Sequence, residues 1–168
     1  YQKDGTAINV TYTTPDDSDY SVEAVAAGRT AVEDGLYSVE DNVITLSGDL
    51  KPGSYTVTFS DDKYASKKSS TLVESGLEEG SVSIENNAVV IADNEKGLTG
   101  ADYAAQVTSV IVNGEPVKAK GIAGILFNED GSINLDAEIE GQDGNVKVFD
   151  GSDSYEIELE ATGYPSVK

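Results

Sequence analysis

The chain contains no cysteine, histidine, methionine or tryptophan. Without cysteine there is no disulfide and no thiol chemistry, which excludes the small disulfide-rich secreted scaffolds. Without histidine as well, the Ser-His and Cys-His nucleophile systems cannot be built, and structural zinc, iron–sulfur clusters and haem held by His or Met lose their ligands. Carboxylate pairs remain, but with 31 acidic residues they arise by chance. We therefore expect no enzymatic activity.

Positive charge and long apolar runs are scarce too. The chain carries 11 basic and 31 acidic residues, a net charge of −20, with −6 in residues 1–72 and −14 in residues 73–168. Such a surface repels nucleic acid and disfavours anionic membranes. No run of 18 apolar residues exists, so we expect no membrane insertion. The acidity serves either solubility or the recognition of a cation or a basic partner.

What the chain does contain is a repeat. Residues 53–68 and 153–168 align without a gap, and a shorter echo relates residues 41–46 to 130–135. The matched positions include two tyrosines in each copy: Tyr55 and Tyr64, Tyr155 and Tyr164. Self-similarity at a fixed period indicates copies of one structural unit. We predict two domains, residues 1–70 and 71–168, with an exposed seam at residues 63–70.

The composition is that of an all-β chain. Val, Ile, Thr, Tyr and Ser dominate the ordered-looking stretches, and 17 glycines punctuate them. Alternation and apolar runs predict strands at residues 6–14, 43–47, 54–60, 81–85, 88–92, 109–112, 121–127, 132–139, 145–149 and 154–161. Residues 20–34 fit either a short helix or a strand. Thr99 is a plausible N-cap for one or two helical turns, and Asn113-Gly114 predicts a tight hairpin.

Several polar clusters can be interpreted either as ligand sites or as solvent-exposed turns. Residues 128–134 are similar to a calcium loop, but its first and twelfth positions fall on Leu126 and Ala137, so a tight Asp-Gly turn explains the same letters. Residues 16–19 and 150–153 also fit solvated turns. An internal Lys–Asn isopeptide crosslink would need a buried lysine, for which Lys118 and Lys147 are the candidates.

The tyrosines allow a similar choice. Tyrosine is enriched at protein interfaces. The repeated pairs, however, recur at one position of each copy, so we expect them to serve the fold, for example as a corner packed against a strand end. The others are freer to contact a partner: Tyr12, Tyr20, Tyr37 and Tyr103.

The second copy resembles a known family. Residues 107–114, the middle segment 133–135 and residues 155–164 together resemble the hemoglobin-interacting type of surface domain, over a span from about Leu72 to the end. That family occurs as repeated modules in large secreted or wall-anchored proteins of Firmicutes. The resemblance implies an immunoglobulin-like β-sandwich on a bacterial cell surface, while the first copy is a divergent relative. It transfers no binding residue to this chain.

Together these observations predict two tandem immunoglobulin-like antiparallel β-sandwich domains in a larger extracellular protein, either secreted or on the cell surface. We expect a non-catalytic module for adhesion, protein binding or spacing, with neighbouring domains of the parent chain and a host or matrix protein as partners. The alternative is a carbohydrate-binding accessory module of a secreted polysaccharide-degrading enzyme. Hemoglobin binding is a third reading. We assign no catalytic, metal or ligand-binding residue and no cofactor, and calcium is the one ion that the acidic turns leave open.

Overall fold

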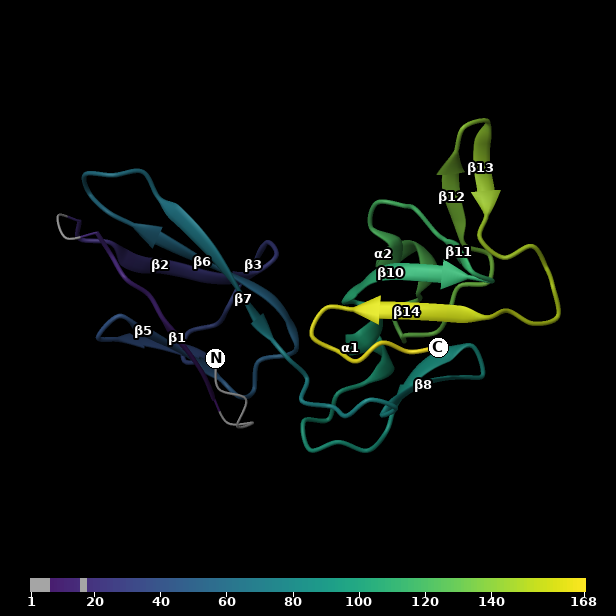
Figure 1. Ribbon diagram of the computed structural model, residues 1–168, viewed down its shortest axis with the longest axis horizontal. Coiled ribbons are helices and arrows are strands. Elements are labelled where there is room, and N and C mark those ends of the chain that lie inside the picture. The colour runs from purple at the N-terminus through teal and green to yellow at the C-terminus, as the bar shows by residue number, and fades with distance from the viewer. Residues whose placement is uncertain (1–6, 16–17) are drawn as a thin grey trace. The chain divides into compact units, whose positions relative to one another are not determined.

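The computed structural model describes residues 7–15 and 18–168. The chain divides into two compact units, Tyr1–Gly76 and Leu77–Lys168. The described residues form antiparallel strands with very little helix, so the predicted all-β class is confirmed (Figure 1). No helix in the described part of the chain has the length and apolar character needed to cross a bilayer.

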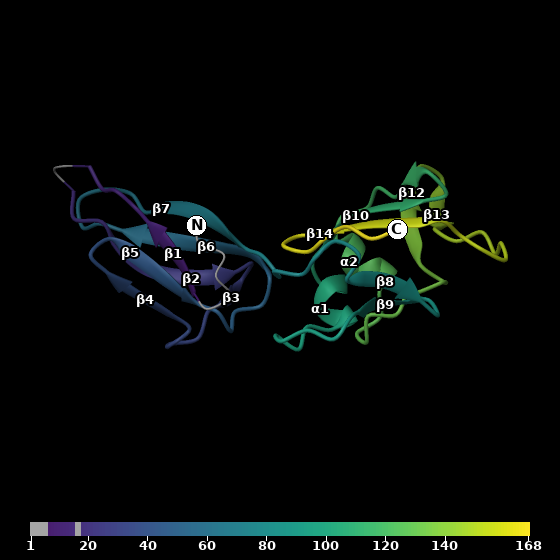
Figure 2. The ribbon, with the colours of Figure 1, turned by 60° about the horizontal axis from the view of Figure 1, so that its bottom comes forward.

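The described residues of the first unit form two antiparallel sheets. One has the order β1-β5-β4, with bounds Ala7–Thr11, Val43–Ser47 and Tyr37–Glu40. The other has the order β3-β2-β6-β7, with bounds Thr30–Ala31, Ser21–Ala27, Gly53–Ser60 and Lys67–Val73. Figure 2 shows the strands of this unit from a second side.

Side chains from both sheets meet in the core of the first unit. Its buried members are Val25, Ile44, Leu46, Leu50, Tyr55, Val57 and Val73. Alternation along β6 turns Tyr55 and Val57 inward, as the sequence predicts. The ambiguous stretch after residue 20 is strand β2. Its register against β6 shifts between Val22 and Ala24, and this irregularity explains why simple alternation fails there.

The structure describes every residue of the second unit, which contains three smaller sheets and two short helices. Its strands are β8 Val82–Glu85, β9 Ala88–Ile91, β10 Val107–Val112, β11 Glu115–Pro116, β12 Glu138–Gly141, β13 Gly144–Lys147 and β14 Ile157–Ala161. The sheets have the orders β11-β10-β14, β12-β13 and β8-β9. The β12-β13 hairpin projects from the rest of this unit (Figure 1).

The helices of the second unit pack against its sheets. Helix α1 (Gly100–Ala104) begins with a capping box, in which Thr99 and Asp102 exchange hydrogen bonds, so the predicted N-cap is confirmed. Helix α1 contributes the fully buried Tyr103, and α2 (Ile122–Leu126) contributes the fully buried Leu126. Both join Val110 and Leu159 of the β10-β14 pair in one core.

Three predicted segments differ from the structure. Residues 121–127 contain helix α2 rather than a strand, because burial of Ile122 and Leu126 follows a spacing of four. In residues 132–139 only β12 at the end is a strand, while Ser132 and Ile133 make isolated bridges. In the expected seam, residues 67–70 belong to β7 and pair with β6.

Candidate functional site

A surface groove of ≈ 520 Å³ lies on the second unit. Strands β8 and β14, the segment before β12 and the loop before β14 supply its walls. The lining residues are Ile84, Asn87, Ile133, Leu135, Ser152, Asp153, Ser154, Tyr155, Glu156, Ile157 and Lys168. The groove therefore unites positions that lie far apart in the sequence.

The floor of the groove is apolar. Ile133 is buried, and Ile84 and Ile157 are half-buried. Leu135 is exposed over 44% of its surface. Other aliphatic side chains of the described residues are exposed as well, namely Val39, Leu72, Val90 and Val146, but Leu135 differs from them because it lines this groove. An apolar side chain at the mouth of a groove is a ready anchor for a partner, because covering it removes apolar surface from water.

The loop that forms one wall is held by its own hydrogen bonds. The Tyr155 hydroxyl accepts from the amides of Gly151 (2.7 Å) and Ser152 (2.8 Å) and donates to Asp150 Oδ1 (3.1 Å). The hydroxyl of Ser152 donates to the same oxygen at 2.6 Å. The hydrogen bonds to Asp150, first the one from the Ser152 hydroxyl and then those from the Ser152 amide and the Tyr155 hydroxyl, lower the pKa of Asp150. The Tyr155 ring also packs on Phe149, with centroids 5.0 Å apart. The wall is thus ordered before any partner arrives.

A second clamp fixes the other end of this loop. The Asn113 amide donates to the Glu156 carbonyl at 2.7 Å, and the Glu156 amide donates to Asn113 Oδ1 at 2.9 Å. Asn113 can do this because it occupies the left-handed turn between β10 and β11, with φ of 51°. The hairpin predicted from Asn113-Gly114 is therefore confirmed, and it also positions the groove.

The rim of the groove is acidic. Two carboxylates, those of Asp153 and Glu156, line the groove. Among its lining residues, all of which the structure describes, Lys168 is the one cation. Lys168 Nζ lies 2.8 Å from Glu156 Oε1 and 2.7 Å from Glu158 Oε1, and these bonds raise the pKa of Lys168. Since this cation is already paired with two carboxylates, the rim keeps a negative balance. Such a rim favours a partner with basic side chains around an apolar anchor.

The tyrosines follow only in part the prediction that the repeated ones serve the fold and the others contact a partner. Tyr55 and Tyr155 both secure the turn before their strand, as expected of a repeated position; the Tyr55 hydroxyl donates to the Lys51 carbonyl at 2.8 Å. Tyr103, expected to be free for a partner, is completely buried, and its hydroxyl donates to the Leu159 carbonyl at 3.2 Å. Tyr64, expected to serve the fold, is 48% exposed.

The remaining tyrosines lie in small apolar clusters. Tyr12 packs on Phe59 at 4.9 Å, and Tyr164 packs on Tyr103 at 5.2 Å. Tyr37 lies partly buried against the core of the first unit. Tyr64 stacks against Tyr20 at 6.4 Å. In the part of the chain that the structure describes, Tyr64 is the one tyrosine among the exposed large apolar side chains.

The loop at residues 128–134 has turn geometry. Asp130 Oδ1 accepts hydrogen bonds from the amide (2.9 Å) and hydroxyl (2.6 Å) of Ser132. Gly131 has φ of 84°, and the backbone of Ala101 leaves no room for a side chain there. Within residues 7–15 and 18–168, no three Asp or Glu side chains gather where they could hold a metal ion. Calcium binding stays a prediction.

Two further expectations concern exposed segments. Lys118 and Lys147 are both exposed, and Lys147 pairs with the exposed Asp136 at 3.4 Å, so neither meets the burial that an isopeptide crosslink requires. Of the turn expected at residues 16–19, residues 16 and 17 lie outside the described residues. The Asp19 amide donates to Asp61 Oδ2 at 2.6 Å.

Sequence reasoning assigned no residue of the groove as a binding residue. Leu135 offered one signal, since it is a large apolar side chain between Asn134 and Asp136, both polar. The partners that shape the groove, from Ile84 to Lys168, come together only through the fold.

Comparison with known proteins bears on this unit. Residues 77–168 match a family model described as the Hb-interacting domain of the Shr-like heme-binding protein. Neither the curated proteins nor the solved structures contain a match. The matched residues coincide with the second unit, which carries the groove.

Proposed function

The chain belongs to the family of Shr-like Hb-interacting domains, and from this we propose that its second unit binds hemoglobin as a protein partner. The groove with Leu135 at its mouth is the docking site. The observation that carries this assignment is an exposed leucine over an apolar floor, on the unit that the family model matches.

The energetics of the groove support protein docking. Protein interfaces obtain most of their affinity from a few side chains that fill well-packed pockets, surrounded by a polar rim. Here Leu135 and the half-buried Ile84 and Ile157 supply apolar surface, and Asp153 and Glu156 supply a charged rim. The wall is held by Tyr155 and Asn113, so little conformational entropy is lost on binding.

We extend the proposal to the setting of the chain. Both units are immunoglobulin-like modules of an extracellular, non-catalytic protein, secreted or displayed on a cell surface. The strand order of the first unit supports the immunoglobulin-like assignment, because sheets of the order β4-β5-β1 and β3-β2-β6-β7 correspond to strands D-E-B and C′-C-F-G of that fold. The family assignment of the second unit supports the extracellular one.

A charge placed in the groove tests the proposal. In the full chain, Leu135→Asp should weaken equilibrium binding to immobilised hemoglobin by about tenfold or more, because the aspartate cannot replace the apolar anchor and adds to the acidic rim. The matched control is Leu72→Asp in the first unit, since Leu72 is 39% exposed against 44% for Leu135. The control should bind as the unmodified chain does. Equal affinity of all three proteins, or no binding of the unmodified chain, would overturn the proposal.

A further inference from the structure

The first unit has a larger cavity of its own, of ≈ 660 Å³. It lies outside the residues that the family model matches and is lined only by residues of the first unit. Its lining residues are Val10, Thr11, Tyr12, Thr13, Thr14, Pro15, Ser18, Tyr20, Ile44, Val57, Phe59, Tyr64, Lys67, Lys68, Ser69, Ser70 and Thr71. Hemoglobin binding by the second unit does not depend on it.

The cavity opens where both sheets end. Strand β1 is the outermost strand of one sheet and β7 that of the other (Figure 2). Residues of both strands line the cavity. Every second residue of an edge strand directs its N–H and C=O away from the neighbouring strand. No strand of the described residues pairs with the outer edge of either β1 or β7. The outer edge of β7 can therefore accept another strand.

The floor suits alternate side chains of an incoming strand. Ile44 is fully buried and Val57 is 2% exposed, so the bottom of the cavity is the core itself. Val57 and Phe59 are two positions apart on one face of β6, which matches the spacing of side chains on a strand. Phe59 and Tyr12 pack together at 4.9 Å and extend the apolar floor.

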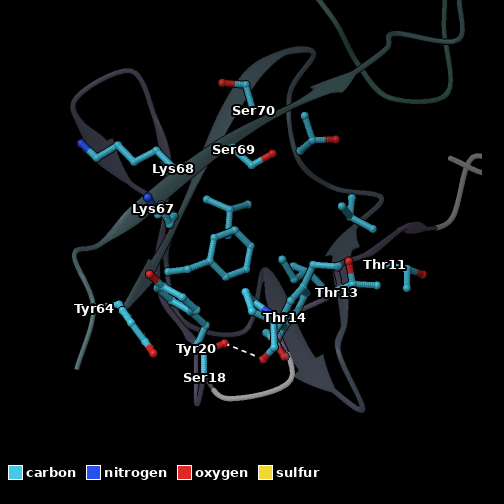
Figure 3. A pocket seen from close by; sticks show the side chains of 17 residues that line it. Thr11, Thr13, Thr14, Ser18, Tyr20, Tyr64, Lys67, Lys68, Ser69 and Ser70 are labelled. Atoms are coloured by element: carbon cyan, nitrogen blue, oxygen red, sulfur yellow. Dashed lines mark hydrogen bonds between the residues drawn. The ribbon is translucent and has the colours of Figure 1, made fainter. Parts of the chain in front are cut away.

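The rim is polar and carries positive charge. Figure 3 shows Lys67, Lys68, Ser69 and Ser70 on one side of the opening, across from Thr11, Thr13 and Thr14. Lys67 and Lys68 form no ion pair with a described residue, although the chain has 31 acidic residues. Unpaired lysines in a chain of net charge −20 attract an acidic ligand to this edge.

We propose that this cavity binds an extended segment of a partner polypeptide, which adds as a strand at the edge of β7. The segment has apolar side chains at alternate positions, which enter over Val57 and Phe59, and acidic side chains that pair with Lys67 and Lys68. Backbone hydrogen bonds to the strand edge supply affinity, and the apolar floor with the two lysines supplies selectivity.

A labelled peptide tests the proposal on the full chain. The probe is a fluorescent peptide of about ten residues in which valine alternates with threonine or glutamate. A scrambled peptide of the same composition, without the alternation, is its control. We expect saturable binding of the alternating peptide, at least tenfold weaker binding of the scrambled one, and new protection from hydrogen exchange in β7.

Charge reversal locates the site. The double change Lys67→Glu and Lys68→Glu should weaken peptide binding about tenfold or more, whereas the equal charge change Lys118→Glu and Lys120→Glu in the second unit should leave it unchanged. Thermal melting checks that both variants fold. If the first variant fails to fold, protection of β7 in the unmodified chain decides the question. Hemoglobin binding, measured in parallel, tests the proposed function separately.

Three results would overturn the proposal. The first is equal affinity for the alternating and the scrambled peptide, or no binding of either peptide. The second is binding that survives the reversal at Lys67 and Lys68 with the fold intact, or that leaves exchange in β7 unchanged. The third is a concentration-dependent dimer that the same reversal abolishes, which would assign the cavity to a second copy of this chain.

Discussion

At the scale of single residues, two repeated tyrosines have one structural role. Tyr55 bonds to the carbonyl of Lys51, and Tyr155 bonds to the amide of Gly151, so each reaches back four positions to the turn before its strand. The direction of the bond differs, since one hydroxyl donates and the other accepts. The shared reach explains why the sequence keeps tyrosine at both positions of the repeat.

Removal of the Tyr55 hydroxyl should lower stability modestly. Tyr55→Phe keeps the buried ring but deletes the hydrogen bond to the Lys51 carbonyl, which contributes about 1 kcal/mol to the free energy of unfolding. Tyr64→Phe is the control, because Tyr64 is 48% exposed and its change should cost almost nothing. Urea unfolding measures both. Equal stability of the two variants would show that the hydroxyl of Tyr55 does not hold the turn.

Tyr103 makes stability depend on alkaline pH. Burial, together with the negative charge of Glu160, raises the pKa of Tyr103 from 10.0 to about 12. The unfolded chain therefore loses this proton first, so the contribution is complete below pH 10 and is lost as the pH rises to about 12. Tyr103→Phe should reduce the fall in unfolding free energy across this range. An unchanged fall, measured by urea unfolding at several pH values, would contradict the assignment.

The sequence predicts roles of residues where the cause is local. The repeat predicts a shared structural role for Tyr55 and Tyr155, and each forms a hydrogen bond with a residue four positions earlier in the chain. It could not distinguish Tyr64 from Tyr164, because their surroundings come from distant segments: Tyr64 stacks on Tyr20, whereas Tyr164 packs against Tyr103.

At the scale of elements, the same contrast separates the two helices. Helix α1 was predictable because Thr99 and Asp102 form its capping box within one turn. Helix α2 was predicted as a strand because a short apolar run fits a buried strand and a buried helix equally. The choice follows from tertiary packing, in which Ile122 and Leu126 enter the core together.

Glycine substitutions in these helices should have opposite effects. A Cβ at Gly100 of α1 would overlap the carbonyl oxygen of Val89, so Gly100→Ala should destabilise the protein by about 1–3 kcal/mol or more. A Cβ at Gly124 of α2 meets no atom within 4 Å, so Gly124→Ala should be neutral or stabilise by up to about 1 kcal/mol. Thermal and urea unfolding measure both changes. A neutral Gly100→Ala would mean that α1 does not pack against β9 as described.

At the scale of the whole molecule, each of the two units has its own core. The all-β class follows from composition, and most strands follow from local alternation. The groove does not, because Ile84, Leu135 and Lys168 are neighbours only after folding. The sequence also shows the charge at this scale, since residues 73–168 carry −14 of the total −20. If this acidity recognises a basic partner, the affinity should fall as the salt concentration rises.

The most direct test of hemoglobin docking in the groove is hydrogen exchange of the full chain with and without hemoglobin at low salt. Docking in the groove should add protection at residues 133–135 and 150–157, which border it. Strand β7 of the first unit should gain no protection. Binding that protects other segments and leaves these two unchanged would contradict the assignment of the groove as the docking site.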